Sequence, residues 1–508
     1  MKRWIDGILS KITMYKLILY YLLALLGIAF LFSATGWLPY TFLGLAFSTV
    51  LVLGVCLWTN VIFSMVAKVQ TNTESVYITA LILILIITPP GPGTWFPTIS
   101  LLCWASILAM ASKYIFSIRN KHVFNPAAFA VVVTALTLNQ SASWWIGTSS
   151  MLFFVILGGY LVIRKVQRIA MAGSFLLTAL GVTALLSFSE ASLWTTAHHA
   201  IVLSPLIFFT AVMLTEPLTT PPTKRWQIVY GCLVGILFSP QFHIGSLYLT
   251  PELALLVGNV FTYLVSPKGR YIMTLVSQHD DGKGVRNFIF RPDKKVDFQP
   301  GQYMEWTLGH TRVDSRGNRR YFTIASSPTE PTVWLGVKFY DKPSSFKSRM
   351  LSMQTWETVI ASQIAGEFTL PKDPTKKLVF IAGGIGITPF RSMLKYLIDK
   401  KEKRSVVTLY SCNTEEEISY KDVWREAQQR LGCKTVVTLT NIEKISPQWT
   451  GQKGFITDEM IVKEVPDYRE RMFYISGPHS IVEATKSVLK KLGIPQSQIK
   501  TDFFPGLA

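Results

Sequence analysis

Acidic residues are scarce in the first half of this 508-residue chain. Up to residue 267 there are five of them, namely Asp6, Glu74, Glu190, Glu216 and Glu252. Long apolar runs fill the same stretch, whereas later apolar runs are strand-length and charges are dense. This change in composition predicts a membrane domain over 1–267 and soluble domains after it. The chain is also too long for a single core, so we expect two or three domains.

Closely spaced cysteines are missing as well. The five cysteines form neither a C-x-x-C pair nor a cluster: Cys56, Cys103, Cys232, Cys412 and Cys433. This pattern argues against an iron–sulfur cluster, and we expect no metal ligands among them. The first apolar run is long and has no convincing cleavage site, so we do not expect a cleavable signal peptide.

A stripe of basic residues interleaved with exposed aromatics, typical of nucleic-acid binding, is also absent. The net charge of +19 is better explained by a membrane protein, because its cytoplasmic loops are rich in Lys and Arg and face anionic lipid. We therefore expect a lipid bilayer and no nucleic acid as a partner.

Apolar runs of about membrane-spanning length predict about ten helices. They cover residues 16–34, 41–67, 75–89, 95–117, 123–138, 149–163, 170–188, 199–215, 227–239 and 249–266. Basic residues precede the first run and follow every second one: Lys2, Arg3, Lys11, Lys16, Lys68, Lys113, Arg119, Lys121, Arg164, Lys165, Arg168, Lys224, Arg225, Lys268 and Arg270. This alternation predicts a multi-pass inner-membrane protein with both termini and the soluble domains in the cytoplasm.

Two polar motifs interrupt the apolar pattern at predicted cytoplasmic helix ends. One is Phe124-Asn125-Pro126-Ala127-Ala128-Phe129 and the other is Thr215-Glu216-Pro217. Their prolines suit a helix start and a helix stop, which is one explanation. The alternative is that Asn125 and Glu216 line a polar cofactor or substrate site between helices.

At these motifs the first 267 residues resemble the Rnf D subunit and the related B subunit of the sodium-pumping NADH:quinone oxidoreductase. That resemblance implies about ten helices and a flavin. The family attaches FMN to a Thr in a Ser-Gly-Ala-Thr context preceded by Asp, whereas the loop here reads Ser141-Ala142-Ser143-Trp144-Trp145-Ile146-Gly147-Thr148, with no such Asp. FMN or riboflavin held non-covalently is therefore the form to consider. Trp144 and Trp145 are expected to be interfacial anchors.

Haem is a weaker candidate for the membrane domain. His122, His198, His199 and His243 all fall at predicted helix ends or in loops, and no two of them share the interior of one span. Axial ligation needs imidazoles at buried, facing positions.

After residue 267 the pattern predicts a β-barrel over 268–374. Its central strand contains Arg319-Arg320-Tyr321-Phe322-Thr323. Alternation places Arg320 and Phe322 on one face, suited to a phosphate and a flat ring, and the Thr323 hydroxyl could bond a ring nitrogen. An ordinary amphipathic strand is the alternative. A later serine-rich segment enters a short helix, and Ser348 there could receive a diphosphate or simply belong to a serine-capped helix.

Residues 375–508 alternate strands and helices, which predicts an α/β domain with a parallel sheet. A glycine-rich loop, Gly383-Gly384-Ile385-Gly386-Ile387-Thr388-Pro389, follows its first strand, and Ser476-Gly477-Pro478 follows a later one. Both loops should lie at the carboxyl edge, where such folds bind dinucleotides. A glycine-rich loop alone would be weak evidence.

Taken in order, these motifs resemble the ferredoxin–NADP reductase family over about residues 270–508. The resemblance implies FAD held at Arg320, Tyr321, Phe322, Thr323, Lys347 and Ser348. It implies NADH or NADPH at Gly383, Gly384, Gly386, Thr388, Pro389, Gly477 and Pro478. Ser476 stands where the family has Cys near the hydride path, so Thr323 and Ser476 are the candidate catalytic residues. Phe503 or Phe504 could cover the flavin, as a C-terminal aromatic often does in the family, or could simply anchor the terminus; we assign this role to Phe504.

The segment after the second strand is acidic, Glu415-Glu416-Glu417, which favours NADH over NADPH. We therefore expect a membrane-bound NAD(P)H-dependent FAD oxidoreductase whose electrons reach a second flavin or a quinone near Asn125 and Glu216. Partner subunits are a further expectation. The alternatives are a redox-driven ion-translocating subunit, a haem-type ferric reductase, and a membrane domain that only anchors a soluble reductase.

Overall fold

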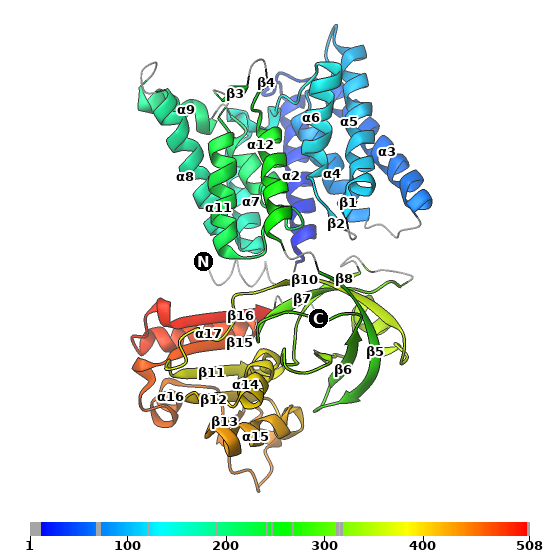
Figure 1. Ribbon diagram of the computed structural model, residues 1–508. Helices are drawn as coiled ribbons and strands as arrows, with labels where there is room; N and C mark the ends of the chain where they lie inside the picture. The colour runs from blue at the N-terminus through cyan, green and yellow to red at the C-terminus, as the bar shows by residue number, and fades with distance from the viewer. Residues whose placement is uncertain are drawn as a thin grey trace. The chain divides into compact units, whose positions relative to one another are not determined.

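The computed structural model describes residues 12–67, 73–118, 121–187, 192–202, 204–239, 242–244, 247–266, 269–310, 314 and 318–504. The chain divides into two compact units, with residues 12–266 in one and the residues from 267 onward in the other (Figure 1). Among the basic residues used to orient the spans, Lys2, Arg3, Lys11, Lys68, Arg119 and Lys268 lie outside the described residues.

The unit of residues 12–266 is helical. Five of its helices are long and apolar enough to cross a membrane: α2 (Met14–Ala34), α3 (Phe42–Ala67), α5 (Trp95–Ile115), α7 (Ser149–Val166) and α8 (Ile169–Leu186). Shorter helices complete it: α4 (Thr73–Ile86), α6 (Pro126–Leu138), α9 (Leu193–Val202), α11 (Lys224–Leu237) and α12 (Pro251–Val265). A membrane domain is therefore supported, and the figure of ten spans stays a prediction.

The segment expected as one span over 199–215 is not a single helix. α9 ends at Val202, and after Pro205 the chain continues as α10 (Leu206–Phe208) and a π-helical turn, η2 (Phe209–Met213). Proline has no N–H and clashes with the preceding turn, so an α-helix does not run through it undisturbed. π-helical turns are rare and are often found at functional sites.

Close packing in this unit relies on small residues. A Cβ placed on Gly231 of α11 would lie 2.6 Å from the carbonyl oxygen of Met171, and one on Gly235 would lie 2.9 Å from that of Phe175. Glycine at these positions lets α11 approach α8 backbone to backbone, as in membrane helix pairs.

The expectation that Trp144 and Trp145 are interfacial anchors is wrong. Both rings are buried, with 6% and 2% of their surface exposed. The Trp144 indole donates to Glu252 Oε1 at 2.6 Å, and the Trp145 indole donates to the carbonyl oxygens of Ile84 and Ile87. The loop folds inward because these buried acceptors satisfy the indole N–H groups.

The second unit begins with an antiparallel barrel sheet in the order β8-β7-β10-β5-β6-β9. Its strands are β5 (Arg270–Asp280), β6 (Val285–Pro292), β7 (Tyr303–Thr307), β8 (Arg319–Thr323), β9 (Val333–Lys338) and β10 (Thr358–Ala365), with helix α13 (Ser345–Leu351) before β10. Alternate residues such as Met273, Leu275 and Phe290 fill the barrel core.

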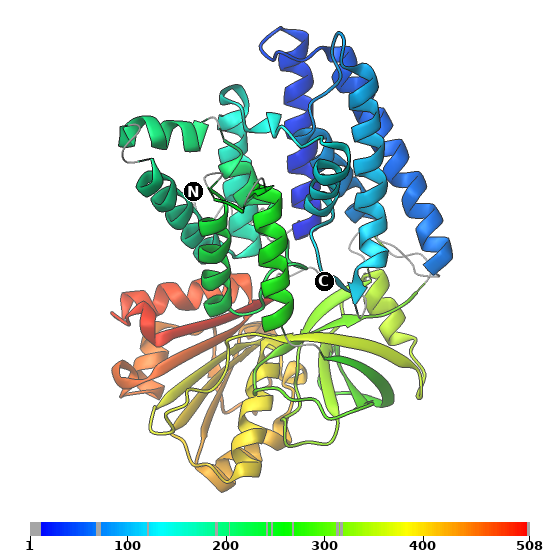
Figure 2. The ribbon, with the colours of Figure 1, turned by 45° about the horizontal axis from the view of Figure 1, so that its top comes forward.

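The remaining sheet has the order β14-β13-β12-β11-β15-β16, and its neighbouring strands are parallel (Figure 2). The strands are β11 (Leu378–Gly383), β12 (Val406–Cys412), β13 (Lys434–Leu439), β14 (Gln452–Lys453), β15 (Met472–Pro478) and β16 (Ile499–Phe504). The helices are α14 (Thr388–Lys400), α15 (Lys421–Leu431), α16 (Asp458–Glu464) and α17 (His479–Lys491).

Strand β11 is buried on both faces. Leu378, Phe380 and Ala382 belong to the core that contains α14 and α15, while Val379 and Ile381 belong to the core that contains α16 and α17. Helices on both faces leave the carboxyl edge of the strands for the loops, which is where the two glycine-containing motifs lie.

Candidate functional site

Arg320 and Phe322 of β8 lie on one face with a third residue, Phe346 of α13. The Arg320 guanidinium carbon lies 5.3 Å from the Phe346 ring centroid, and the Phe322 centroid lies 5.9 Å from it. Sequence reasoning missed Phe346, although it directly precedes Lys347 and Ser348 in the predicted phosphate segment. The structure therefore brings the predicted strand and the predicted short helix together.

Thr323 ends β8 and is buried, and its Oγ1 has no hydrogen-bond partner among the described residues. Tyr321 lies on the other face from Arg320 and Phe322: its hydroxyl donates to Glu305 Oε2 at 2.8 Å, and 41% of its surface is exposed. A buried hydroxyl without a partner costs free energy, so the Thr323 position fits a ligand that carries polar ring atoms.

Helix α13 begins at a serine cap. Ser344 Oγ accepts from the Lys347 N–H at 3.3 Å, and the Ser348 N–H donates to the Ser344 carbonyl at 2.8 Å. The Lys347 ammonium donates to the Lys338 carbonyl oxygen at 2.8 Å and lies 5.3 Å from the Tyr340 ring centroid. Both roles predicted for Ser348 stay open, because a capped helix turn also presents N–H groups.

The two glycine loops lie against each other. A Cβ on Gly386 would lie 2.3 Å from the Ser476 carbonyl oxygen, and one on Gly477 would lie 3.0 Å from that of Gly383. Gly384 also adopts φ +49°, a conformation that favours glycine. Thr388 and Pro389 then open α14. This backbone contact without side chains is the kind of surface that a dinucleotide diphosphate requires.

Ser476 lies near the end of β15 and is fully buried, and its Oγ has no hydrogen-bond partner among the described residues. Asp502 of β16 is its register partner, so both side chains point to the same side of the sheet. Asp502 Oδ2 is also buried without a partner there, and burial raises the pKa of this carboxyl to about 7. Sequence reasoning missed Asp502, although it directly precedes the aromatic pair that was singled out.

Phe504 pairs with Pro478 in the β15–β16 ladder. Its backbone therefore lies beside the second glycine-containing loop, while its side chain lies outside the described part of the structure.

A buried ion pair joins the loop between β8 and β9 to helix α14. The Arg391 guanidinium pairs with Glu330, donates to the Ala325 carbonyl oxygen at 3.1 Å, and stacks 4.3 Å from the Trp334 ring centroid. Ser392 Oγ donates to the Ser326 carbonyl at 2.6 Å. These contacts fix the segment that follows β8 relative to α14, the helix after the first glycine loop.

The acidic segment after β12 is partly engaged with the barrel. Glu416 pairs with Lys283 at 2.8 Å, and Glu417 pairs with Lys338 at 2.9 Å. Glu415 Oε1 accepts from the Ser446 N–H at 3.2 Å. The negative charge expected at this edge is present, and two of its carboxylates also connect the barrel and the α/β layer.

In the helical unit, Asn125 and Glu216 meet as expected. Asn125 Nδ2 donates to Glu216 Oε2 at 2.8 Å, and Thr219 Oγ1 donates to the same oxygen at 3.1 Å. His122 Nε2 lies 3.1 Å from Glu216 Oε1, and the Asn125 N–H donates to Asn259 Oδ1 at 2.8 Å. Sequence reasoning missed His122 and Asn259 as partners.

Asn125 also serves as a helix cap, since its Oδ1 accepts from the Ala128 N–H at 3.0 Å. The punctuation explanation is therefore confirmed for this residue, whereas its role in lining a cofactor or substrate site stays a prediction. Among the described residues, no group of three or more His, Cys, Asp or Glu side chains is placed to hold a metal ion.

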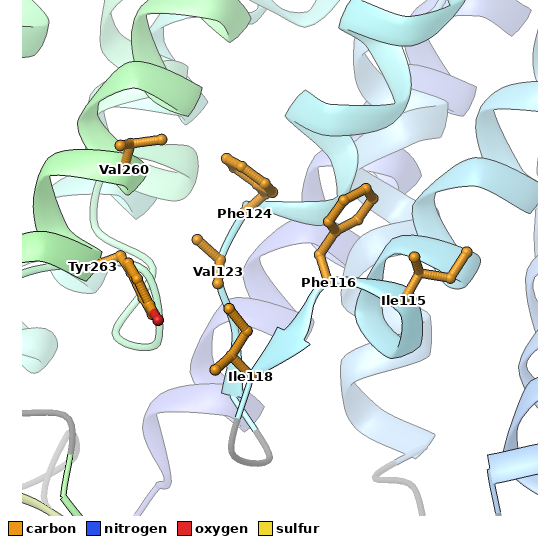
Figure 3. A pocket seen from close by; sticks show the side chains of 7 residues that line it. All are labelled: Ile115, Phe116, Ile118, Val123, Phe124, Val260 and Tyr263. Carbon is orange, nitrogen blue, oxygen red and sulfur yellow. The ribbon is translucent and has the colours of Figure 1, made fainter.

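The helical unit contains an apolar pocket of about 280 Å³ (Figure 3). Two of its lining residues, Val123 and Phe124, directly precede Asn125 in the sequence. It is lined by residues from the end of α5, from β1 (Ser117–Ile118), from the segment before α6, and from α12: Ile115, Phe116, Ile118, Val123, Phe124, Val260 and Tyr263. Neither Asn125 nor Glu216 lines it, so it is not the polar site that the motifs predicted.

Comparisons with known proteins agree with both resemblances. Residues 136–268 match the NQR2, RnfD, RnfE family, and residues 380–487 match the oxidoreductase NAD-binding domain. The reductase subunit of glycine betaine monooxygenase from Chromohalobacter salexigens is 26% identical over 241 residues, 46% of this chain and 64% of that protein. A flavohemoprotein from Bacillus thuringiensis is 28% identical, over 43% of this chain and 57% of that protein.

Among solved structures, the flavohem-like FAD/NAD-binding domain of nitric oxide dioxygenase from Vibrio cholerae overlaps with 18% identity and a TM-score of 0.41, covering 46% of this chain and 98% of that one. The chain spans less than two thirds of the curated relatives named above. The two family matches together identify an Rnf/NQR-type membrane segment followed by an oxidoreductase NAD-binding domain in one chain.

Proposed function

We propose that this protein is a membrane-bound flavin oxidoreductase that passes electrons from NADH or NADPH through FAD to an acceptor in or at the membrane. The observation that carries the proposal is a pair of buried hydroxyls without partners among the described residues, Thr323 and Ser476. One ends the strand suited to a flavin and the other lies in the paired glycine loops. The relatives, which include reductases, support the same reaction class.

In this proposal the barrel holds FAD. Arg320 binds a diphosphate oxygen, Phe322 contacts the ring system, and the Thr323 hydroxyl bonds a polar ring edge. Lys347 and Ser348 contribute to the phosphate end, Tyr321 contributes through its backbone, and Phe504 covers the ring. When bound, the flavin accepts a hydride and can release electrons one at a time, which is chemistry that no side chain supplies.

The α/β layer holds the dinucleotide. Backbone N–H groups of Gly383, Gly384 and Gly386, at the start of α14, bind the diphosphate, and Thr388 and Pro389 set the helix entry. Gly477 and Pro478 form the opposite wall, with Ser476 beside the transferred hydrogen. We assign 268–374 to the barrel domain and 375–508 to this domain.

We further propose that the acceptor is a second flavin, bound non-covalently, or a quinone near Asn125 and Glu216. The joined network of His122, Asn125 and Glu216 supports a polar function there, because such groups are costly within a membrane. We also propose about ten spans in an inner membrane with both termini cytoplasmic, an orientation that the distribution of basic residues supports. Electron-transfer partner subunits would extend the path.

Ion translocation coupled to this reaction is a second candidate. It is favoured by a second buried carboxylate in the helical unit, Glu252, which is 3% exposed and bonded to Trp144. Sodium-dependent turnover in proteoliposomes would support it, and turnover that is independent of sodium and of the proton gradient would exclude it.

Absorbance of the purified protein in detergent, followed by cofactor extraction, tests the main proposal. We expect flavin bands that bleach on adding NADH and extracted FAD, with a second flavin or quinone reduction in the full chain. A colourless protein that stays inert to NADH and NADPH after FAD is supplied would overturn it.

A further inference from the structure

Helix α15 begins without a capping side chain of its own. The residue before it, Tyr420, lies at φ +57°, and its side chain makes no capping hydrogen bond within the described residues. Its N–H donates to the carboxylate of Asp281, at 3.2 Å from Oδ1 and 3.3 Å from Oδ2. Asp281 lies at the tip of the β5–β6 hairpin, so the barrel supplies the negative charge that stabilises the start of this helix.

The same hairpin tip holds the segment just before α15. Ser419 Oγ donates to the Asp281 carbonyl oxygen at 2.6 Å, and the Lys283 N–H donates to the Glu416 carbonyl oxygen at 2.7 Å. Gly282 lies between them at φ +88°, and a Cβ there would come within 3.1 Å of that Glu416 oxygen. The hairpin therefore fixes the acidic segment after β12, a position that contacts the adenosine ribose in dinucleotide-binding folds.

The Tyr420 side chain extends this contact into the barrel. Tyr420 is 2% exposed, and its hydroxyl donates to Asn287 Oδ1 at 2.7 Å. Asn287 is fully buried, and its Nδ2 donates to Asp281 Oδ2 at 3.0 Å. Tyr420, Asn287 and Asp281 thus form a closed cycle of hydrogen bonds between the barrel and the α/β layer. A buried polar network whose members all have partners makes the structure around it rigid.

Gly336 of β9 brings the first glycine loop to the same point. It pairs in register with Asn287, so a Cβ on Gly336 would lie on the face of the sheet that carries the Asn287 side chain. That Cβ would lie 2.2 Å from the Tyr420 hydroxyl oxygen and 2.9 Å from Thr388 Cγ2. Thr388 is the residue at which α14 begins. The tyrosine hydroxyl and the threonine methyl group therefore both pack against Gly336.

The backbone conformation of Tyr420 is unfavourable for a bulky residue. Glycine and asparagine adopt a φ of this sign with less strain. Such strain persists where surrounding contacts hold the residue in place, and Asp281, Asn287 and Gly336 provide those contacts here. What distinguishes tyrosine at this position is therefore the reach of its ring and hydroxyl into the barrel.

We propose that Tyr420, held by Asp281 and Asn287, is a positioning residue for hydride transfer. It fixes the acidic segment and the first glycine loop relative to β8, the strand assigned to the flavin. The inference rests on the proposed function, which places the dinucleotide on these two segments. Tyr420 acts through them and does not itself contact the transferred hydrogen.

The expected effect is on rate and not on affinity. A displacement of about 1 Å can slow a reaction between two bound groups by about 100-fold. The groups that bind the dinucleotide all belong to the α/β layer, so they keep their arrangement when the contact with the barrel is loosened. The pair of Arg391 and Glu330 still joins the layers in such a variant, and their alignment alone changes.

The experiment uses the full chain loaded with FAD. Tyr420→Phe removes the hydroxyl and keeps the ring, and Gly336→Ala disturbs the same contact from the barrel because its methyl group must displace the tyrosine hydroxyl or Thr388. Tyr474→Phe is the matched control, since Tyr474 is also buried and its hydroxyl donates to the Thr369 carbonyl oxygen at 2.9 Å.

Three measurements separate alignment from stability. Stopped-flow absorbance at rising NADH concentrations gives the limiting rate of flavin bleaching and the apparent dissociation constant of NADH. The charge-transfer absorbance of a nicotinamide stacked on a flavin reports their alignment directly. Thermal unfolding reports the stability of each variant.

We expect the limiting rate to fall about tenfold or more in Tyr420→Phe and Gly336→Ala, with a weaker charge-transfer band and less than about a twofold change in the dissociation constant. Tyr474→Phe should lower the melting temperature and leave the limiting rate unchanged. A limiting rate within about twofold of the parent in either FAD-loaded variant would overturn the inference, because the contact would then be purely structural. A weaker affinity for NADH that accounts for the whole loss would overturn it as well. Failure of the proposed function looks different, since NADH would then not bleach the parent protein either.

Discussion

At the scale of single residues, the contact between Gly386 and the Ser476 carbonyl is a tight constraint. We expect Gly386→Ala to destabilise the protein by about 1–3 kcal/mol, because the new methyl group must displace backbone atoms. NADH-dependent bleaching of the flavin should slow by a larger factor than the stability change alone explains.

Stopped-flow absorbance and thermal unfolding measure the two effects. Gly309→Ala is the control, since a Cβ there would meet no atom of the described residues within 4 Å. Unchanged flavin reduction in Gly386→Ala would contradict the role assigned to the paired loops.

Asp502 should make the stability of the protein depend on pH. Burial raises the pKa of its carboxyl to about 7, above the unfolded value of about 3.9, so the folded state holds a proton that the unfolded state loses. The contribution of Asp502 to stability is therefore greatest below about pH 4 and falls as the pH rises toward 7.

Asp502→Asn removes this titration, and we expect the variant to be more stable than the parent at pH 8 by about 1–3 kcal/mol. Melting temperatures measured from pH 5 to pH 8 provide the check. Parallel curves for parent and variant would show that the carboxyl does not titrate in this range.

Local sequence identified residues whose role depends on their own motif, and it missed residues whose role depends on partners elsewhere. Arg320 and Phe322 were placed on one face by alternation alone. Phe346, Asp502 and His122 became relevant only through residues far along the chain, such as Glu216 for His122. Nothing in a single sequence without homologues encodes those pairings.

At the scale of elements, the junction between β8 and α14 depends on the buried pair of Arg391 and Glu330. We expect Glu330→Ala to cost about 3–5 kcal/mol, because it leaves the guanidinium of Arg391, which is 3% exposed, without its carboxylate. Lys491→Ala breaks an exposed pair with Asp458 and should cost far less stability, because water screens that pair. Chemical denaturation of both variants tests the contrast, and equal losses would refute it.

Asn125 directly precedes helix α6, caps its first turn and donates to Glu216. Asn125→Asp keeps the cap but puts two carboxylates 2.8 Å apart, so we expect a loss of about 1–3 kcal/mol in the stability of the helical unit. Asn125→Ser keeps a capping oxygen without the added charge and is the control.

Thermal unfolding in detergent measures the difference between these two variants. Reduction of a membrane acceptor should fall in Asn125→Asp while ferricyanide reduction persists. Equal loss of both activities would place the defect in the reductase.

Helices and strands were predictable where one pattern of apolar residues dominates a stretch of the sequence. The apolar runs and the alternation of strands and helices indicated a membrane part followed by a dinucleotide-type part, and both are supported. The break at Pro205 and the burial of Trp144 were missed, because an apolar composition cannot distinguish a continuous span from a broken one and an indole acceptor such as Glu252 is remote in sequence.

At the scale of the whole molecule, the chain separates into two units with their own cores. We expect residues 269–508, expressed alone, to form a soluble yellow protein that reduces ferricyanide with NADH and prefers NADH over NADPH, given the acidic segment after β12. Reduction of a membrane acceptor should require the full chain. Absorbance and steady-state kinetics of the fragment and of the full chain test this prediction. If the fragment reduced quinone at the same rate as the full chain, that result would count against an acceptor site in the helical unit.

The double burial of β11 has a consequence for engineering. Because its successive residues belong to separate cores, a library that varies Leu378 and Phe380 changes the packing beneath α14, the helix that opens at the first glycine loop, and beneath α15. A library that varies Val379 and Ile381 changes the packing on the side of α16 and α17. The two faces of the nucleotide layer can thus be redesigned independently, and the tilt of α14 can be adjusted without touching a residue of either loop.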